Sequence, residues 1–368
     1  MPRFSRRSFL HLSAAASAAA ALRFASEPML AAAARPPHAD DVVVIDSNEN
    51  PLGPCAGARS AVSEIIPRGG RYSLNLTKDL TESIAQAEGF GPDYVWVTVG
   101  STPALALTVL AFTSAQKSYV TADPGYEAGM RVAPVAGGRV VKVPLTKSYA
   151  HDVKAMLAAA PDAGVFYVCT PNNPTGTLTP HADVEYLVEN KPKDSIVLVD
   201  EAYIHFTEAA QTTLDLVKAG KDVIVLRTFS KIYGMAGLRC GMAIGRPDLL
   251  AKVREQGFNM MPVTAVVAAS ASLKDHQLVP ERRRINARVR HQTFEWLKHN
   301  GYSYIPSESN CFMLDTKRSG KEVREAMAKE NVLVGRIWPV MPSYVRITVG
   351  TLEEMERFQS AWQRVMKS

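Results

Sequence analysis

The chain has 368 residues, of which 46% are hydrophobic and 21% are charged, values that are ordinary for a soluble globular protein with a large core. Its formal net charge is +6 at pH 7, and the first 34 residues carry about half of that excess. The remainder is too small to predict binding to nucleic acid or to a membrane surface, and no basic stripe with interleaved aromatic residues appears.

The first 34 residues have the pattern of an export signal. Arg6 and Arg7 form a twin-arginine pair, an apolar run rich in alanine extends from Leu12 to Leu22, and small residues follow at Ala31 to Ala34. This order predicts a twin-arginine signal peptide over residues 1–34 and a periplasmic or secreted mature protein. The apolar run is too short to predict a transmembrane helix, so no stable membrane association is expected after processing.

Beyond the signal, short apolar runs alternate with helical patterns. We expect seven strands at Tyr94–Val99, Ser118–Ala122, Val140–Pro144, Val165–Cys169, Ile196–Val199, Val223–Leu226 and Cys240–Ile244. Most of these runs are continuously apolar, which is typical of a mostly parallel sheet covered by helices on both faces. Helices are expected at Asp79–Glu88, Ala104–Phe112 and Ala182–Glu189.

After Pro262 the pattern changes. Long helices are expected over residues 264–300, short strands near Cys311–Leu314 and Tyr344–Val349, and a final helix at 352–366. The whole predicts an α/β protein with a large domain and a smaller α+β C-terminal domain. The four cysteines show no metal-ligand spacing and are expected to be buried free thiols, and the scattered histidines predict no metal site.

Lys231 is the most informative single residue. It lies in the run Thr228–Arg239, with a hydroxyl at Ser230 and a guanidinium at Arg239. A lysine in such a run suits an imine-forming nucleophile, and the hydroxyl and guanidinium suit a phosphate. Pyridoxal phosphate requires both. Taken alone, the run is also compatible with an exposed lysine in a glycine-containing loop.

Two further strand ends carry polar side chains. Ile196–Val199 leads into Asp200 and Tyr203, where a carboxylate would keep the pyridine nitrogen of the cofactor protonated and a phenol would bond its phenolate oxygen. The alternative is that Asp200 caps a helix. Val165–Cys169 leads into a turn with two prolines that presents Asn173, and the alternative there is an ordinary tight loop.

A phosphate site and a ring-stacking residue complete the set. Ser101 and Thr102 follow a strand and open a helix, where free backbone amides bind phosphate. Tyr126, in Asp123–Tyr126, could stack on the cofactor ring or could be a core tyrosine. Each pattern is weak by itself, but their order along the chain and their places at strand ends make chance a poor explanation.

With these residues in place, the chain resembles the fold-type I pyridoxal-phosphate-dependent aminotransferases of class I/II, and most closely their histidinol-phosphate aminotransferase branch. The resemblance spans residues 42–366. The matching stretches are Ser47–Pro54, Arg71–Tyr72, Pro171–Gly176, Val199–Tyr203, Ser230–Lys231, Gly237–Arg239 and Arg346–Gly350.

The resemblance implies a role for each residue around the cofactor ring. Lys231 would form the Schiff base with pyridoxal 5'-phosphate and then move the proton at the substrate Cα. Asp200 would pair with the pyridinium, Asn173 and Tyr203 would bond the phenolate oxygen, and Tyr126 would stack on the ring. Lys231, Asp200 and Tyr203 are the catalytic candidates.

It also implies the phosphate and substrate contacts. Ser101, Thr102, Ser230 and Arg239 would hold the phosphate, Tyr72 would reach the cofactor of the other subunit in a homodimer, and Arg346 would clamp the substrate α-carboxylate. Arg336 and Asn50 are further substrate-binding candidates. The implied domains are an N-terminal arm at 35–65 that packs with the small domain, a large cofactor-binding domain at 66–262 and a small domain at 263–368.

The substrate is the open question. Arg336 matches an arginine that helps to bind the substrate phosphate in histidinol-phosphate enzymes, but its neighbours Ile337 and Trp338 are large and apolar where that branch often has polar residues. Export also disfavours histidine biosynthesis, which is cytoplasmic. We therefore expect transfer between a free amino acid and a 2-oxo acid. The alternatives are a histidinol-phosphate aminotransferase, a decarboxylase or racemase of the same fold, and a catalytically silent cofactor-fold binding protein.

Overall fold

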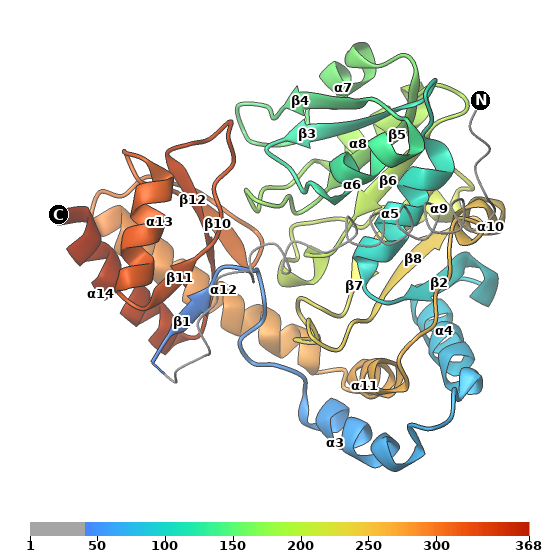
Figure 1. The fold of residues 1–368 in the computed structure, drawn as a ribbon, viewed down its shortest axis with the longest axis horizontal. Coiled ribbons are helices and arrows are strands. Elements are labelled where there is room, and N and C mark those ends of the chain that lie inside the picture. Colours follow the sequence, from blue (N-terminus) through green and yellow to red (C-terminus); the bar gives the residue numbers. More distant parts are fainter. Residues whose placement is uncertain (1–40, 368) are drawn as a thin grey trace, which may run out of the picture. The chain divides into compact units, whose positions relative to one another are not determined.

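The computed structural model describes residues 41–367, so the expected signal peptide at residues 1–34 lies outside the described residues. A seven-stranded sheet forms the centre of the larger part, with strand order β2-β8-β7-β6-β5-β3-β4 (Figure 1). Its strands are β2 (Val95–Thr98), β3 (Ser118–Asp123), β4 (Val140–Pro144), β5 (Ala163–Cys169), β6 (Ile196–Asp200), β7 (Val223–Thr228) and β8 (Gly241–Gly245). Two pairings in this sheet are antiparallel, those of β8 with β2 and with β7, and the other four are parallel, so the mostly parallel sheet is confirmed.

Helices cover this sheet in two groups. One group packs around α5 (Ser101–Phe112), with α6 (Ala128–Val132) and α10 (Pro247–Arg254) beside it; the other joins α7 (Val153–Ala159) to α8 (His181–Asn190). The short helix α9 (Leu214–Lys218) contacts β7 and β8. Every residue of β5, β6 and β7 is buried, which explains why these strands are continuously apolar up to their last residues rather than alternating.

Three helices lie beyond the β2 edge. They are α3 (Ala56–Ile65), α4 (Leu74–Glu88) and α11 (Val263–Lys274); α11 packs against both of the others, and α4 contacts β2 (Figure 1). Ala265 and Val266 of α11 belong to the same apolar cluster as the seven-stranded sheet. Single 3-10 turns lie at Ile66–Arg68, Pro92–Tyr94, Ala133–Ala136 and Ile204–Phe206.

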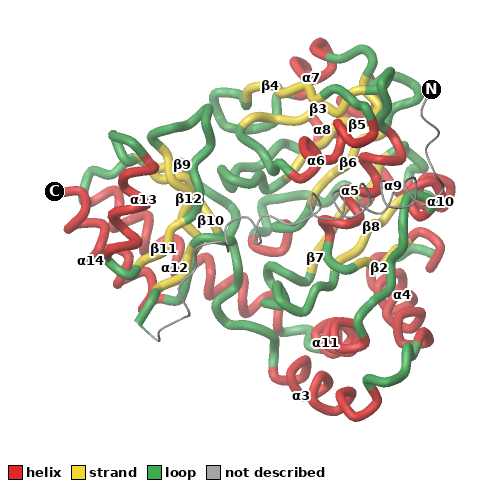
Figure 2. Tube along the Cα trace, in the orientation of Figure 1, coloured by secondary structure: helices red, strands yellow, loops and turns green. Residues whose placement is uncertain are grey.

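The C-terminal part has its own sheet and its own apolar cluster (Figure 2). Its elements are α12 (Leu278–His299), β9 (Tyr304–Ile305), β10 (Cys311–Asp315), α13 (Gly320–Lys329), β11 (Val332–Val334), β12 (Tyr344–Thr348) and α14 (Leu352–Lys367). β12, β10 and β9 form an antiparallel sheet, and β1 (Val43–Ile45) pairs in parallel with β11. The expected helices and strands of this part are confirmed, whereas β1, β9 and β11 are too short to show in the sequence.

The expected domain bounds stay a prediction. The expected N-terminal arm at 35–65 contributes β1 to the C-terminal part and α3 to the α11 side of the larger part. All four cysteines are buried and unpaired, as expected: Cys55, Cys169, Cys240 and Cys311. Among residues 41–367 no helix is long and apolar enough to cross a membrane, and no cluster of metal-ligating side chains occurs.

Candidate active site

Parallel strands bring the predicted catalytic residues to one edge of the large sheet. β5 ends at Cys169 and β6 ends at Asp200, and these two residues are directly paired in the sheet. β7, the next parallel strand, ends at Thr228. Because the carboxyl ends of neighbouring parallel strands meet at the same edge, the segments that carry Asn173, Asp200 and Lys231 all leave the sheet there.

Asp200 is a buried carboxylate with two hydrogen bonds. It is 4% exposed; its Oδ2 accepts from the hydroxyl of Tyr167 at 2.8 Å and its Oδ1 accepts from the backbone N–H of Ala202 at 3.0 Å. Burial raises the pKa of Asp200 to about 6, against the lowering effects of the Tyr167 bond and the Lys231 charge. The next helical turn begins only after Tyr203, so Asp200 caps no helix.

Lys231 points into the protein rather than into solvent. Its Nζ donates to the backbone carbonyl of Asn48 at 3.1 Å and to that of Ser47 at 3.4 Å. It also lies 5.4 Å from the centroid of the Tyr203 ring. These contacts contradict the alternative of an exposed lysine in a loop and place the amine between the β1 arm and the ends of β6 and β7.

Asn48 holds Tyr203 in place and was not predicted as a site residue. Its Nδ2 donates to the Tyr203 hydroxyl at 3.0 Å, and its Oδ1 accepts from the hydroxyl of Thr348 at 3.2 Å. Asn48 is 1% exposed and has φ of 54°, a left-handed conformation that asparagine tolerates better than most residues. Its partners are 155 and 300 residues away in sequence, so only its place in the Asn-Glu-Asn-Pro stretch could have indicated it.

Arg346 and Asn173 are bonded to each other. Arg346 lies in β12, is 4% exposed, and donates from Nη1 to Asn173 Oδ1 at 2.8 Å and from Nη2 to the backbone carbonyl of Asp46 at 2.7 Å. Within the described residues its Nε has no hydrogen-bond partner. A buried guanidinium with an unused donor is suited to a carboxylate. The same geometry leaves the amide nitrogen of Asn173 as its donor for another oxygen.

The start of α5 forms a narrow turn over Arg239. Gly100 has φ of 85°, and a Cβ added there would lie 2.3 Å from Arg239 Nη2, so only glycine fits. Arg239 also donates from Nη1 to Ser230 Oγ at 3.2 Å. The backbone amides of Ser101 and Thr102 lie in the first turn of the helix, where no intrahelical acceptor exists for them. Amides, hydroxyl and guanidinium therefore converge as a set of donors for an anion.

Tyr126 is attached to the same turn. Its hydroxyl lies 3.1 Å from Thr102 Oγ1, and the residue is half-buried. Asn50 lies beside Lys231: its Nδ2 donates to the backbone carbonyl of Ile232 at 3.0 Å. Tyr72 is different, since its side chain is 74% exposed on the segment before α4.

Arg336 is held by residues that were not predicted. Its Nη1 donates to Glu127 Oε2 at 2.6 Å, and its guanidinium lies 4.2 Å from the centroid of the Trp338 ring. Glu127 directly follows Tyr126. Nothing in the sequence indicated that Glu127 pairs with a residue 209 positions away.

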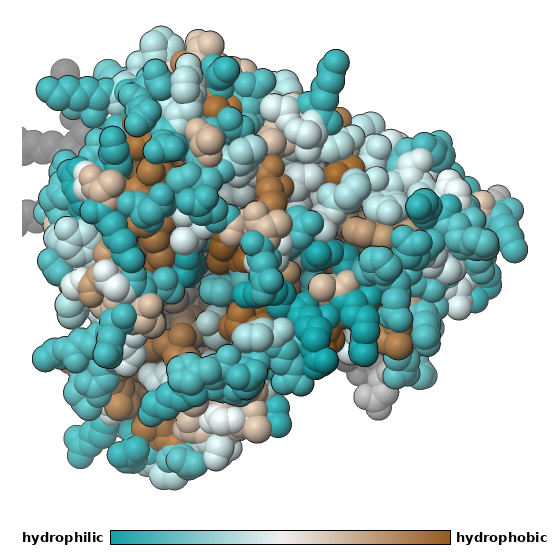
Figure 3. Space-filling view, turned by 180° about the vertical axis from the view of Figure 1, so that it is seen from behind, coloured by the Kyte–Doolittle hydropathy of each residue, from teal (hydrophilic) through white to brown (hydrophobic). Residues whose placement is uncertain are grey.

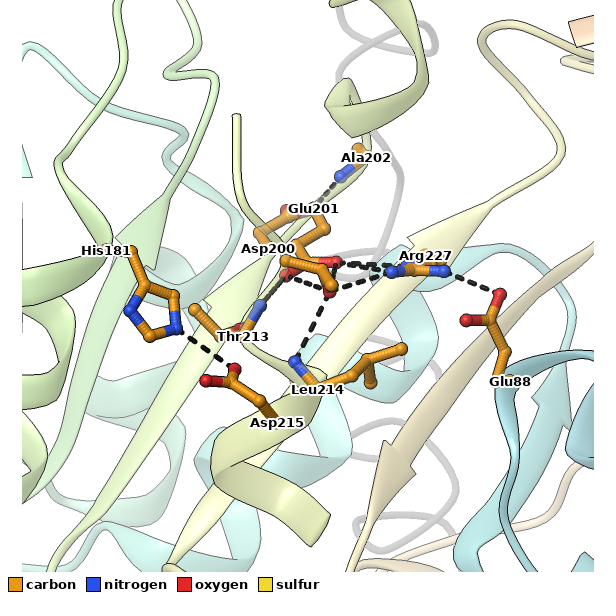
Figure 4. A network of polar contacts seen from close by, with 10 residues as sticks. Glu88, His181, Asp200, Glu201, Ala202, Thr213, Leu214, Asp215 and Arg227 are labelled. Atoms are coloured by element: carbon orange, nitrogen blue, oxygen red, sulfur yellow. Dashed lines mark hydrogen bonds and ion pairs between the residues drawn. The ribbon is translucent and has the colours of Figure 1, made fainter. Parts of the chain in front are cut away.

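A buried ion-pair network lies behind the catalytic edge (Figure 4). Arg227 donates from Nε to Glu201 Oε2 at 3.0 Å and from Nη1 to Glu88 Oε1 at 2.6 Å, and Glu201 also accepts from the backbone N–H of Thr213 at 2.7 Å. Glu201 directly follows Asp200, and Arg227 lies near the end of β7. A fully bonded buried pair is costly to break, so it fixes the two strand ends relative to each other.

Comparisons with known proteins find relatives over most of the chain. Residues 40–361 match the family model for aminotransferases of class I and II. The chain is 35% identical over 335 residues to a histidinol-phosphate aminotransferase of Moorella thermoacetica, covering 89% of this chain and 86% of that protein. It is 33% identical over 334 residues to an aromatic amino acid aminotransferase of Cutibacterium acnes, covering 90% and 94%. A crystal structure of histidinol-phosphate aminotransferase from Sinorhizobium meliloti in complex with pyridoxal-5'-phosphate matches with a TM-score of 0.81 and 25% identity, covering 88% and 91%.

The chain belongs to the class I and II aminotransferases. It is a pyridoxal-phosphate-dependent transaminase of fold type I, as the resemblance implied.

The residues present fit pyridoxal 5'-phosphate. The turn at Gly100 lies against Arg239 at the start of α5, where free backbone amides, the guanidinium and the Ser230 hydroxyl can serve as donors to a phosphate. Asp200 is buried and its pKa is raised, so an added cation such as a pyridinium would relieve the cost of its charge. Lys231 supplies the amine within the same edge of the sheet.

Proposed function

We propose that this enzyme transfers amino groups between a free amino acid and a 2-oxo acid, with Lys231 as the residue that binds the cofactor covalently. One observation carries the proposal: Lys231, Asp200 and Arg346 lie around the same strand ends. Lys231 Nζ is 5.4 Å from the centroid of the Tyr203 ring, and Arg346 donates at 2.8 Å to Asn173 on the turn after β5, the strand paired with that of Asp200. The charge of Lys231 lowers the pKa of Asp200, and the charge of Arg346 lowers that of Tyr203 against the raising effect of burial.

Pyridoxal 5'-phosphate supplies a reactive carbonyl carbon and an electron-accepting ring when it is bound. Lys231 then holds and moves the proton at the substrate Cα. Asp200 keeps the ring nitrogen protonated, because a carboxylate that is costly to bury gains from a cation at bonding distance. Tyr203 and the amide nitrogen of Asn173 donate to the phenolate oxygen, and Asn48 orients the Tyr203 hydroxyl.

The phosphate is held by the start of α5. The amides of Ser101 and Thr102, the hydroxyl of Ser230 and the guanidinium of Arg239 are the donors, and the hydrogen bond between Ser230 and Arg239 sets their spacing. Tyr126 covers the ring, with its hydroxyl anchored on Thr102.

The substrate carboxylate binds Arg346. Asn173 and Asp46 accept hydrogen bonds from Nη1 and Nη2 of this guanidinium and so fix the orientation of its plane. The remaining N–H donors lie in that plane and suit a planar anion such as a carboxylate. A free amino acid has such a carboxylate on its Cα, next to the carbon at which Lys231 acts. Asn50, beside Ile232, borders the same space.

The test is a donor screen with the purified mature protein, using 2-oxoglutarate, pyruvate and phenylpyruvate as acceptors. We expect at least one free amino acid to be used with kcat/KM well above that of histidinol phosphate. The second candidate, histidinol-phosphate aminotransferase, is favoured by the names of relatives such as the Moorella protein. Turnover of histidinol phosphate well above every free amino acid would establish it and overturn the first.

The enzyme also acts as a homodimer in this proposal. Aromatic and aliphatic side chains are exposed between α3 and α4, namely Ile66, Tyr72 and Leu74, and Phe258 and Met260 are exposed before α11. Figure 3 shows apolar groups breaking the hydrophilic surface on the face turned away from Figure 1. Five exposed side chains of this kind on two short segments are the support for a contact surface between two copies of the chain. Tyr72 then reaches the cofactor phosphate of the second copy, and sedimentation of the mature protein tests the dimer.

Export by the twin-arginine route is the last part of the proposal. Its support is the order of Arg6, Arg7 and the apolar run Leu12–Leu22 in the sequence. This route carries folded proteins, so the enzyme would acquire its cofactor before it crosses the membrane. Replacing Arg6 and Arg7 together by lysine should keep the full-length chain in the cytoplasm; processed protein in the periplasm of that variant would refute the route.

A further inference from the structure

We infer that Glu127 determines specificity: by occupying Arg336, it makes the enzyme favour substrates with neutral side chains over substrates whose side chains carry a negative charge. The inference rests on the proposed function, because it concerns the side chain of an amino acid or 2-oxo acid whose carboxylate is bound at Arg346.

The ion pair lies between residues assigned to the cofactor and to the substrate. Glu127 directly follows Tyr126, whose hydroxyl contacts Thr102 at the phosphate turn at 3.1 Å. On the other side, the backbone carbonyl of Arg336 accepts from the backbone N–H of Arg346 at 3.3 Å. The guanidiniums of Arg336 and Arg346 also lie 4.2 and 5.6 Å from the centroid of the same Trp338 ring, so a substrate carboxylate held by Arg346 lies close to the Glu127–Arg336 pair.

Arg336 is fixed in the paired position. Its guanidinium lies 4.2 Å from the centroid of the Trp338 ring, and Trp338 is 1% exposed. The indole Nε1 of Trp338 donates to the backbone carbonyl of Gly125 at 3.0 Å. The Trp338–Gly125 and Arg336–Glu127 hydrogen bonds thus tie the segment after β11 to the segment that carries Glu127, so Nη1 of Arg336 cannot turn to an anion without leaving Glu127.

The negative charge of Glu127 decides which substrate side chains bind beside Arg336. Arg336 Nη1 and Glu127 Oε2 are 2.6 Å apart with side chains 24% and 26% exposed, so water screens the pair only partly. A carboxylate or phosphate brought to Arg336 would meet the negative charge of Glu127, whereas a neutral side chain leaves the pair intact. Like charges brought together across an interface are a strong means of excluding a ligand.

Arg131 does not cancel this effect. It bonds the same Glu127 oxygen at 3.1 Å, but its side chain is 36% exposed and it lies on α6, four residues after Glu127. Its charge is therefore more strongly screened than that of Arg336. Glu127 is therefore shared by Arg336 and Arg131, and an aromatic or aliphatic side chain placed beside the Trp338 indole adds no second negative charge next to it.

The test compares two unreactive carboxylates on the cofactor-loaded enzyme: 3-phenylpropionate, which has a neutral end, and glutarate, which has an anionic end. Their dissociation constants are read from the visible absorbance of the bound cofactor. Glu127→Gln removes the charge with little change of shape. We expect it to tighten glutarate relative to 3-phenylpropionate by about tenfold or more, which corresponds to about 1.4 kcal/mol.

Asp123→Asn is the matched control. It removes the same charge from the segment four residues earlier, but Asp123 pairs with Lys142 at 3.2 Å and not with Arg336. In this variant the ratio of the dissociation constants of glutarate and 3-phenylpropionate should stay within about twofold of the wild-type ratio. That is well below the tenfold change that corresponds to about 1.4 kcal/mol. If this ratio shifted equally in both variants, the effect would come from the net charge of the protein and not from Glu127, and the inference would be overturned.

Activity gives an independent readout. In Glu127→Gln, kcat/KM for glutamate should rise relative to that for phenylalanine with one common acceptor. If the wild type is active and the folded variant keeps the same ratio of kcat/KM for glutamate and phenylalanine, the role of Glu127 is overturned and the proposed function is not. Failure of the wild type to use any free amino acid would instead overturn the proposed function on which the inference rests.

Discussion

Arg346 Nη1 donates a hydrogen bond to Asn173 Oδ1 at 2.8 Å, which joins β12 of the C-terminal part to the turn after β5. The residue proposed to bind the substrate carboxylate and the residue proposed to contact the cofactor ring are therefore set relative to each other. If Arg346 binds the carboxylate, this bond pre-organises its guanidinium, which lowers the entropic cost of placing the substrate Cα.

Lys231→Ala tests the covalent role. The variant loses both the nucleophile and the group that moves the Cα proton, so turnover should fall by several orders of magnitude and the visible absorbance of the lysine-bound cofactor should vanish. Absorbance spectra and single-turnover kinetics measure the two effects. Near-normal turnover would refute the assignment, and an unchanged circular dichroism spectrum shows that the fold is kept.

Asp200 should give the cofactor-free protein a characteristic pH dependence. Its folded-state pKa of about 6 lies above the usual value near 4, so the folded state binds the proton more tightly than the unfolded state does. The stability that this proton contributes is complete below about pH 4 and is lost as the pH rises through about 6. Two pKa units correspond to about 3 kcal/mol.

Asp200→Asn removes this titration. Between pH 4 and pH 7 the free energy of unfolding of the variant, minus that of the wild type, should increase by up to about 3 kcal/mol. Urea unfolding of both cofactor-free proteins across this range measures the difference. A difference that does not vary with pH would show that Asp200 titrates normally, and an unaltered turnover rate in the loaded variant would remove its role at the ring nitrogen.

The parts of the fold that the sequence predicted are those with a local cause. Continuous apolar runs revealed β5, β6 and β7, and the polar residues directly after β5 and β6 indicated the catalytic edge because strand direction alone puts them there. Lys231 and Asp200 needed no knowledge of distant contacts.

The residues that were missed are selected by partners far away in sequence. Tyr167 sits within β5 among apolar residues, and nothing local indicates that its hydroxyl bonds Asp200. Glu127 looks like a surface acid until Arg336 is brought to it. Arg227 and Glu201 read as ordinary strand-end charges until the sheet places them together. Side-chain pairing across the fold is a tertiary property, so a pattern in a single sequence does not contain it.

Tyr167→Phe should weaken the carboxylate at the ring nitrogen without altering the fold. The Tyr167 hydroxyl donates to Asp200 at 2.8 Å in a fully buried setting, and its bond lowers the pKa of Asp200. Leaving a buried carboxylate without one donor costs about 1–3 kcal/mol. We expect the acid limb of the kcat/KM profile to shift to higher pH and kcat to fall by about tenfold or more, since tenfold corresponds to 1.36 kcal/mol.

Tyr119→Phe is the matched control for that variant. Tyr119 is as deeply buried, and its ring lies 6.1 Å from that of Tyr167, but the hydroxyl that bonds Asp200 is that of Tyr167. It should therefore leave the pH profile in place. If the two variants behave alike, Tyr167 acts through packing and not through Asp200.

Arg346 separates recognition of the carboxylate from the rest of the reaction. Truncating one partner of a buried, hydrogen-bonded charge pair costs about 2–5 kcal/mol, so Arg346→Ala should lower kcat/KM for every amino acid donor by roughly thirtyfold to several thousandfold. Arg346→Lys keeps the charge but lacks the planar guanidinium, and it should recover only part of the loss.

The decisive comparison is between phenylalanine and 2-phenylethylamine, which has the same side chain and no carboxylate. Activity with the amine should be nearly the same in the wild type and in Arg346→Ala, while activity with phenylalanine falls. An equal loss with both donors would mean that Arg346 supports the site through its bonds to Asn173 and Asp46 rather than by binding the substrate.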